Sequence, residues 1–257
     1  MRVKPRAWIA VAVLVAYAAI MGVIWTVTGT DYETVGLTAD DAFRGIVVTV
    51  GAAALFIAGT TTYLGWWRPA LRETPTGPRW LLILPIAVFL TSVGTLLSKG
   101  ITGVDTNLVL TLALGTLFVG FGEEMATRGV GVVALRGSMG EVGVWLVSSL
   151  LFGALHSINV LFGQSLTDTV RQIGFAFAMG SVLYVIRRVT GALVVCILLH
   201  AFWDFATFVS AASTGATSVF AVLSLFQYVA IVIALVGLVI VLRKGRVDIE
   251  TTTALAR

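Results

Sequence analysis

The sequence predicts an all-α fold, a bundle of about eight membrane-spanning helices, on the strength of three observations. Apolar residues make up 58% of the 257 residues and charged residues only 12%, whereas soluble globular domains carry about 25% charged residues. The apolar residues form eight runs, each close to the ~20 helical residues that cross a bilayer. Charged residues and prolines gather between these runs. The composition therefore excludes a soluble enzyme, a disordered segment and a nucleic-acid binder.

Each predicted span is bounded by residues typical of loops. The spans are, in order, Trp8–Thr28, Phe43–Gly65, Trp80–Leu97, Asn107–Leu135, Val142–Phe162, Thr169–Ile186, Ala192–Ser210 and Ser218–Leu242. The apolar run of the first exceeds the roughly 7–15 residues of a signal peptide, so we expect a retained helix. Prolines and arginines within 67–79 indicate a loop before the third span. The fourth span is long enough to tilt or break, and its glycines allow close helix packing. Arg187 and Arg188, followed by Gly191, are expected to end the sixth.

The basic residues predict how the spans are oriented. Setting Arg128 aside, thirteen Lys and Arg fall on the side of the N-terminus and three on the opposite side. The thirteen are Arg2, Lys4, Arg6, Arg68, Arg72, Arg79, Arg136, Arg187, Arg188, Arg243, Lys244, Arg246 and Arg257, and the three are Arg44, Lys99 and Arg171. Because cytoplasmic loops are enriched in Lys and Arg, both termini are predicted to be cytoplasmic. The chain shows no internal repeat, and we expect one integral membrane domain, 1–257.

Ionisable residues inside the predicted spans indicate a functional site, because such groups are costly in a bilayer. They are Glu123, Glu124 and Arg128 on the fourth span, His156 on the fifth, and His200 and Asp204 on the seventh. At 1.5 Å per residue, Glu124, His156 and His200 lie roughly 18, 22 and 18 Å from the predicted cytoplasmic ends. Three groups on three helices therefore share one layer near the middle of the membrane.

Helical spacing suggests how the acidic residues are used. Glu124 and Arg128 are four residues apart, in the favourable order for an ion pair on one helix face. Glu123 points about 100° away from Glu124, so we expect the two glutamates to face different partners and Glu123 to face a cavity. Asp204, one turn after His200, is expected to fix the imidazole tautomer or to contact substrate.

The spacing around His156 predicts its neighbours in the same way. Phe152 lies one turn before this histidine and is expected to pack beside it. Asn159, three residues after His156, is expected to donate a hydrogen bond.

These motifs resemble those of a known family. Glu123-Glu124-x-x-x-Arg128, Phe152-x-x-x-His156 and His200-x-x-x-Asp204 are similar, in order and spacing, to the three motifs of the CPBP family, the CAAX proteases and bacteriocin-processing proteins, also called Abi. The resemblance covers about 107–204 and implies a catalytic core at about 107–212. It implies an intramembrane endopeptidase similar to the Ras-converting CAAX endopeptidase, in a membrane that we expect to be a bacterial cytoplasmic membrane.

Roles for the six residues follow from this resemblance and from the chemistry of peptide hydrolysis, which needs a base, a held water and an oxyanion donor. Glu123 would be the base that activates water, helped by His156. His200, with Asp204 or Asn159, would stabilise the oxyanion or protonate the leaving amine. Glu124 and Arg128 would form a structural pair that holds the helix of Glu123.

The sequence favours hydrolysis without a cofactor. Two histidines and a carboxylate could bind zinc, and the ligands would then be Glu123, His156 and His200. However, the H-E-x-x-H motif is absent and the three residues come from separate helices. The single cysteine, Cys196, lies one turn before His200 but is more typical of a packing residue than of a nucleophile.

Two other functions remain open at this point. Buried carboxylates and histidines also build proton relays, so a proton-coupled transporter is an alternative. A non-catalytic immunity or partner protein could keep the same residues as structural pairs. The expected partners are a peptide or membrane-protein substrate and the lipid bilayer, with no nucleic acid.

Overall fold

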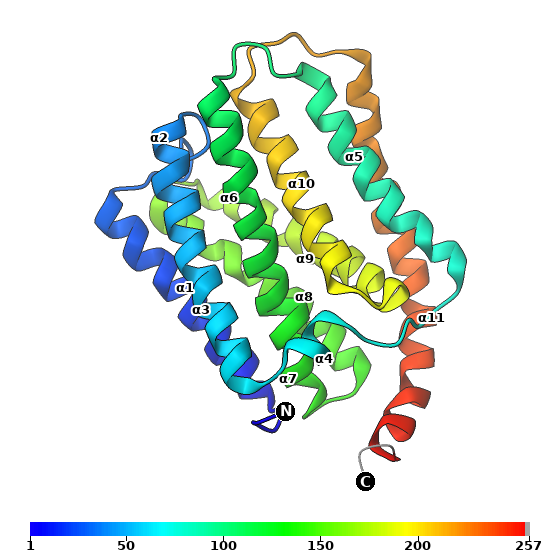
Figure 1. Ribbon diagram of the computed structural model, residues 1–257. Coiled ribbons are helices and arrows are strands. Elements are labelled where there is room, and N and C mark those ends of the chain that lie inside the picture. The colour runs from blue at the N-terminus through cyan, green and yellow to red at the C-terminus, as the bar shows by residue number, and fades with distance from the viewer. Residues whose placement is uncertain (255–257) are drawn as a thin grey trace.

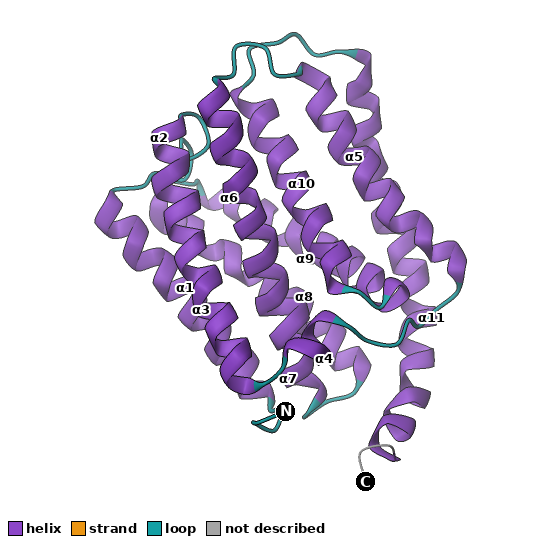
Figure 2. Ribbon diagram, in the orientation of Figure 1, coloured by secondary structure: helices purple, strands orange, loops and turns teal. Residues whose placement is uncertain are grey.

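The computed structural model describes residues 1–254, with side chains described as far as Arg243. Three basic residues of the charge count have side chains outside the described part: Lys244, Arg246 and Arg257. Residues 255–257 of the predicted domain also lie outside the described residues. All regular structure in the described residues is helical, as Figure 2 shows. Eight of the described helical segments are long and apolar enough to cross a membrane, which confirms the predicted fold class.

The eight spans consist of α-helices with short π-helical and 3₁₀ segments labelled η. The first four are α1 (Ala7–Thr28); α2 (Ala39–Ala42), η1 (Phe43–Val48) and α3 (Thr49–Leu64); η2 (Arg79–Leu82) and α5 (Ile83–Lys99); and α6 (Thr106–Glu124), η3 (Met125–Gly131) and α7 (Val132–Arg136). The last four are α8 (Glu141–Leu155) and η4 (His156–Phe162); α9 (Leu166–Thr190); α10 (Leu193–Ala212); and η5 (Val219–Leu225) and α11 (Phe226–Ala254). A short helix, α4 (Trp67–Leu71), lies in the proline-rich connection.

The last helix, α11, continues to Ala254, past the predicted end of the eighth span at Leu242. In the first seven spans, two boundaries differ from the sequence prediction by four residues, each for a local reason. The second span begins at Ala39 because the Thr38 hydroxyl accepts a hydrogen bond from the backbone N–H of Asp41, which caps the helix. The sixth continues to Thr190 because Arg187 and Arg188 are buried and paired with an acidic residue, as described below.

The helices form a bundle in which α6 is central. It packs against α10 and α3, while α8 packs against α9 on the far side (Figure 1). The start of α1 and the end of α11 lie at the same end of the bundle. Outward faces expose large apolar side chains such as Leu55 and Leu110, which are 75% and 64% exposed. Such a continuous apolar exterior requires a lipid environment, and the chain is a multi-pass integral membrane protein.

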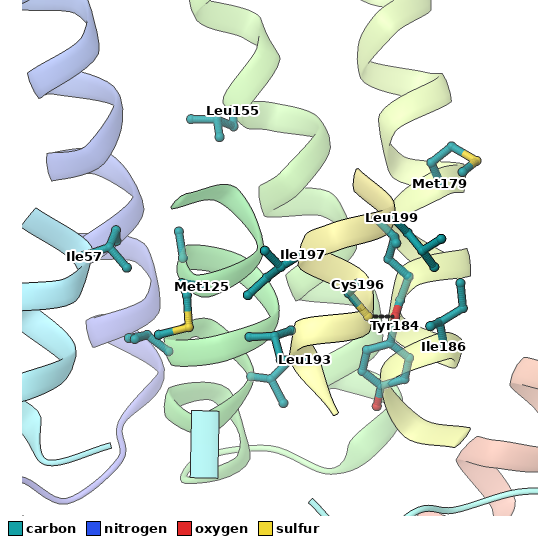
Figure 3. Packing of buried hydrophobic residues seen from close by; sticks show 14 of the residues in the cluster. Ile57, Met125, Leu155, Met179, Tyr184, Ile186, Leu193, Cys196, Ile197 and Leu199 are labelled. Atoms are coloured by element: carbon teal, nitrogen blue, oxygen red, sulfur yellow. Dashed lines mark hydrogen bonds between the residues drawn. The ribbon is translucent and has the colours of Figure 1, made fainter. Parts of the chain in front are cut away.

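The interior between α6, α9 and α10 is tightly packed with aliphatic and sulfur-containing side chains. Figure 3 shows Cys196 in this core beside Leu193 and Ile197. The Cys196 thiol is fully buried and donates a hydrogen bond to the carbonyl of Leu183 at 3.3 Å. Cys196 is thus a packing residue, as the sequence favours.

Candidate active site

The two adjacent glutamates lie at the point where α6 ends. Glu123 and Glu124 are its last residues, and the π-helical turn η3 follows at once. The break that the sequence allows in the fourth span is therefore this π turn, a feature found often at functional sites. A Cβ at Gly131 would lie 2.7 Å from the carbonyl oxygen of Ala126, so glycine is required where the wider turn closes.

A second glycine brings α6 against α10. A Cβ at Gly120 would lie 2.5 Å from the Ile197 carbonyl oxygen and 2.9 Å from the Ala201 amide nitrogen. These contacts are with backbone atoms of α10, which cannot move aside independently of the helix. The absence of a side chain at Gly120 therefore allows the helix of Glu124 to approach the helix of His200.

The pair predicted from spacing forms in the interior. Arg128 Nη1 donates to Glu124 Oε1 at 2.9 Å, and both side chains are fully buried. The guanidinium also lies over the ring of Phe152, 3.9 Å from its centroid, a cation–π contact. A Cβ at Gly180 would lie 2.5 Å from Arg128 Nη2, so α9 leaves space for the guanidinium. Glu124 is thereby held in one position.

His200 contacts both glutamates, which corrects one sequence prediction. Its Nδ1 lies 3.2 Å from Glu124 Oε1, and its Nε2 lies 3.9 Å from Glu123 Oε2 and 3.4 Å from Asp204 Oδ2. The expectation that adjacent glutamates must face different partners was wrong. An imidazole ring presents nitrogens in two directions, so one residue on a facing helix can reach two carboxylates that diverge on their own helix.

His156 lies at the start of the 3₁₀ segment η4, where α8 ends. Its Nδ1 hydrogen-bonds to the carbonyl oxygen of Phe152 at 3.0 Å. The ring of Phe152 meets the rings of His156 and His200 edge-on, with centroids 5.4 and 5.5 Å apart. Phe152 thus packs beside His156, as the spacing predicts, and also contacts His200.

Asn159 belongs to a chain of polar groups that spacing alone does not reveal. Its Nδ2 donates to Gln172 Oε1 at 2.9 Å, and Gln172 Nε2 donates to the hydroxyl of Tyr32 at 2.8 Å. Tyr32 lies in the connection 29–38 and Gln172 on α9. Gln172 stands out in the sequence as an amide within an apolar span, whereas nothing in the sequence marks Tyr32.

Two adjoining cavities, of about 110 and 220 Å³, meet at these residues. Both are lined by Tyr32, His156, Gln172, His200, Asp204 and Phe208. Glu123 and Asn159 line the smaller one only, together with Met21 and Trp25 of α1. The larger one is more apolar and is lined by Phe175, Met179 and Trp203. The cavity system therefore draws on more elements than the fourth, fifth and seventh spans of the sequence prediction, because α1, α5, α9 and the 29–38 connection pack around it.

The charged groups near the cavities do not form a metal site. Among the residues whose side chains are described, no group of three or more His, Cys, Asp and Glu is arranged so that it could hold a metal ion. The zinc set considered from the sequence, Glu123, His156 and His200, is thus not grouped as metal ligands among the described side chains.

A second buried ion cluster lies at the end of the bundle where α1 begins. It was not predicted from the sequence. Glu73 accepts from Arg136 at 2.6 Å and from Arg188 at 2.9 Å, and lies 3.3 Å from Arg187. Arg136 also pairs with Glu141 at 2.6 Å. These arginines were expected in loops as topology signals. Pairing with two glutamates instead allows Arg187 and Arg188 to be buried within α9.

The arginines of this cluster lower the pKa of Glu73. Burial by itself would raise the pKa, but the charges of Arg187, Arg136 and Arg188 lower it from the ordinary 4.5 to about 2. The connection 72–78 is also tied to the end of α9 by the backbone, since Glu73 N donates to the Gly191 carbonyl and Thr76 N to that of Arg188. The cluster thus fixes the connection between the second and third spans.

Comparison with known proteins identifies the segment that carries these motifs. Residues 105–206 match the family model described as type II CAAX prenyl endopeptidase Rce1-like. The matched segment runs from the start of α6 into α10 and contains all eight motif and neighbouring residues predicted from the sequence. No curated protein and no solved structure matches the chain. Residues 105–206 are therefore similar to the Rce1-like CAAX prenyl endopeptidases, in agreement with the resemblance of the motifs.

Proposed function

We propose that the protein is an intramembrane glutamic endopeptidase that hydrolyses a peptide bond with water activated by Glu123. The observation that carries the proposal is the meeting of the Glu123 carboxylate and the His200 imidazole, 3.9 Å apart, at the wall of a cavity between spanning helices. A base, a second proton-transfer group and room for a water lie together, and Glu123 and His200 are only 7% and 9% exposed. These are the groups that hydrolysis of an amide requires.

Glu123 acts as the base. Its Oε2 is buried and has no hydrogen-bond partner among the described residues, so a carboxylate lone pair is free to accept from a water in the cavity. The water proton passes to Glu123, and the hydroxide oxygen adds to the peptide carbonyl carbon. His156 assists: with Nδ1 donating to the Phe152 carbonyl, the neutral ring keeps a lone pair on Nε2 as a second acceptor for this water.

His200 supplies the proton for the leaving group. An imidazolium donates from both nitrogens, and here each nitrogen faces a carboxylate oxygen, Glu124 at Nδ1 and Asp204 at Nε2. The Nε2 proton passes to the amide nitrogen as the C–N bond breaks, which gives a free amine and a carboxyl group. The proton taken by Glu123 then returns to His200 across the 3.9 Å between them. Glu124 and Arg128 keep the imidazole in place.

The proposed substrate is a hydrophobic peptide or a membrane-protein segment, of the CAAX type or a bacteriocin or other peptide precursor. The apolar wall of the larger cavity, with Phe175, Met179 and Trp203, suits an apolar part of such a substrate. We propose hydrolysis without a metal ion, because the sequence lacks the H-E-x-x-H motif and the described side chains are not grouped as metal ligands. We also propose that the membrane is a bacterial cytoplasmic membrane. Both termini are proposed to be cytoplasmic, which is supported by the excess of Lys and Arg at the end of the bundle where α1 begins.

The test compares the full chain with Glu123→Gln in proteoliposomes. Two probe sets are used: farnesylated and unmodified peptides ending in Cys-aliphatic-aliphatic-X, and apolar leader peptides, with cleavage followed by mass spectrometry. Glu123→Gln should lower turnover by at least ~10²-fold and leave thermal unfolding nearly unchanged. The matched control is Glu33→Gln, at an exposed glutamate outside the cavities, which should cleave like wild type. Full cleavage by Glu123→Gln would refute the mechanism, and proton-coupled uptake without cleavage would favour a transporter.

A further inference from the structure

The polar chain from Asn159 through Gln172 to Tyr32 has a defined direction. Asn159 Nδ2 donates to Gln172 Oε1, so the Gln172 amide nitrogen must point the other way, toward Tyr32. Tyr32 accepts this hydrogen bond through its phenolic oxygen at 2.8 Å. A phenol that accepts still carries its own proton, and that proton has no acceptor among the described residues. The chain therefore leaves one hydrogen-bond donor uncommitted at Tyr32.

The hydroxyl of Tyr32 is held at the wall of both cavities. Tyr32 lines the two cavities together with His156, His200 and Asp204. Its backbone N–H donates to the carbonyl of Phe162 at 2.7 Å, and its ring lies 6.1 Å from that of Trp25. The residue is only partly buried, with its ring against the core and its oxygen toward the polar groups. The donor is thus positioned before any substrate binds.

Tyr32 remains protonated under working conditions. Burial raises its pKa, the hydrogen bond from Gln172 lowers it, and the negative charges of Asp204 and Glu123 raise it further, to about 12. Both carboxylates line the smaller cavity together with Tyr32. A neutral phenol close to these groups can donate a hydrogen bond but does not act as a base near pH 7.

We propose that Tyr32 is a further substrate-contacting residue, whose hydroxyl donates a hydrogen bond to the scissile carbonyl oxygen and to the oxyanion that forms from it. This inference rests on the proposed endopeptidase function. Tyr32 keeps its proton throughout, and no bond to it forms or breaks. With the oxyanion held by Tyr32, His200 is free to protonate the leaving amine. Asn159 and Gln172 are positioning residues that set the direction of the donor.

Two variants test the proposal. Tyr32→Phe removes only the hydroxyl, and kcat should fall about 10²-fold, the loss typical of one oxyanion donor, with KM within about twofold. Gln172→Glu replaces the amide donor by an acceptor, so the Tyr32 proton turns toward residue 172. This second variant should lower kcat in the same way while the contact between the two side chains is kept. The control is Tyr63→Phe, at a tyrosine that is 70% exposed and should behave as wild type.

The outcomes separate this inference from the function on which it rests. Kinetics with the farnesylated and leader peptides are measured for each variant beside Glu123→Gln, with thermal unfolding in detergent. Loss of cleavage in Glu123→Gln together with wild-type kcat in Tyr32→Phe overturns the role of Tyr32 alone. A lower melting temperature of Tyr32→Phe with unchanged kcat also overturns it, since the hydroxyl would then be structural. Full cleavage by Glu123→Gln, or no cleavage by wild type, counts against the proposed function and this role together.

Discussion

Substituting Gly120 by alanine should separate the two helices that carry the site. The added Cβ would lie 2.5 Å from the Ile197 carbonyl oxygen, whereas ordinary contacts begin at 3.4 Å. Relief of the clash therefore needs a shift of about 0.9 Å between α6 and α10. The same shift would stretch the contact between His200 Nδ1 and Glu124 Oε1 from 3.2 Å to about 4.1 Å, beyond hydrogen-bond reach. A misplacement of about 1 Å can lower turnover about 10²-fold.

The assay is peptide cleavage in proteoliposomes, with kcat measured beside the thermal unfolding of each variant in detergent. Gly59→Ala is the matched control, because a Cβ at this glycine of α3 would meet nothing within 4 Å. We expect Gly59→Ala to retain wild-type turnover and Gly120→Ala to lose about 10²-fold. If Gly120→Ala instead keeps both its kcat and its melting temperature, the close approach of α6 to α10 is not what positions His200.

Three further predictions concern charged groups. Arg128→Met should lower the free energy of unfolding by about 3–5 kcal/mol, because it removes the guanidinium paired with the buried Glu124 carboxylate. Adding Glu124→Gln should recover part of this loss in thermal unfolding, and an additive double variant would contradict the prediction. Glu73, whose pKa is lowered from 4.5 to about 2, should contribute about 3 kcal/mol of stability above pH 4.5 that is lost as the pH falls toward 2. Unfolding of Glu73→Gln between pH 7 and 3 should therefore depend less on pH than that of wild type, and equal slopes would count against the cluster. A zinc chelator such as 1,10-phenanthroline should leave peptide cleavage unchanged, and a loss restored by added zinc would overturn the metal-free mechanism.

The spans could be predicted from the sequence because the bilayer imposes a one-dimensional rule. Each helix must satisfy its own backbone hydrogen bonds and present about 20 apolar residues to lipid, and both requirements are visible in the order of residues. The i, i+4 pair of Glu124 and Arg128 could be predicted for the same reason, since it lies within one helix. The four-residue differences in the second and sixth spans depend on a cap at Thr38 and on ion pairs of Arg187 and Arg188 with another segment.

The candidate site, too, could be predicted only in part. Its ionisable members could be listed from the sequence because charges are rare in the spans, but their mutual contacts could not. That His200 reaches both Glu123 and Glu124 depends on the facing of α6 and α10 and on the glycine at their crossing. No sequence pattern marks Tyr32 as a site residue, because it lies in a connection between spans and belongs to none of the helical motifs.

The order of residues alone thus predicts an all-helical membrane protein, lists the ionisable residues within its spans, and indicates the family that their spacing resembles. The packing of the helices brings Glu123, His200 and Asp204 to one cavity, adds Tyr32 and Gln172 to it, and buries a second set of arginines by pairing with Glu73. Hydropathy and helical periodicity are local properties, whereas the distance between groups on different helices depends on how the helices pack.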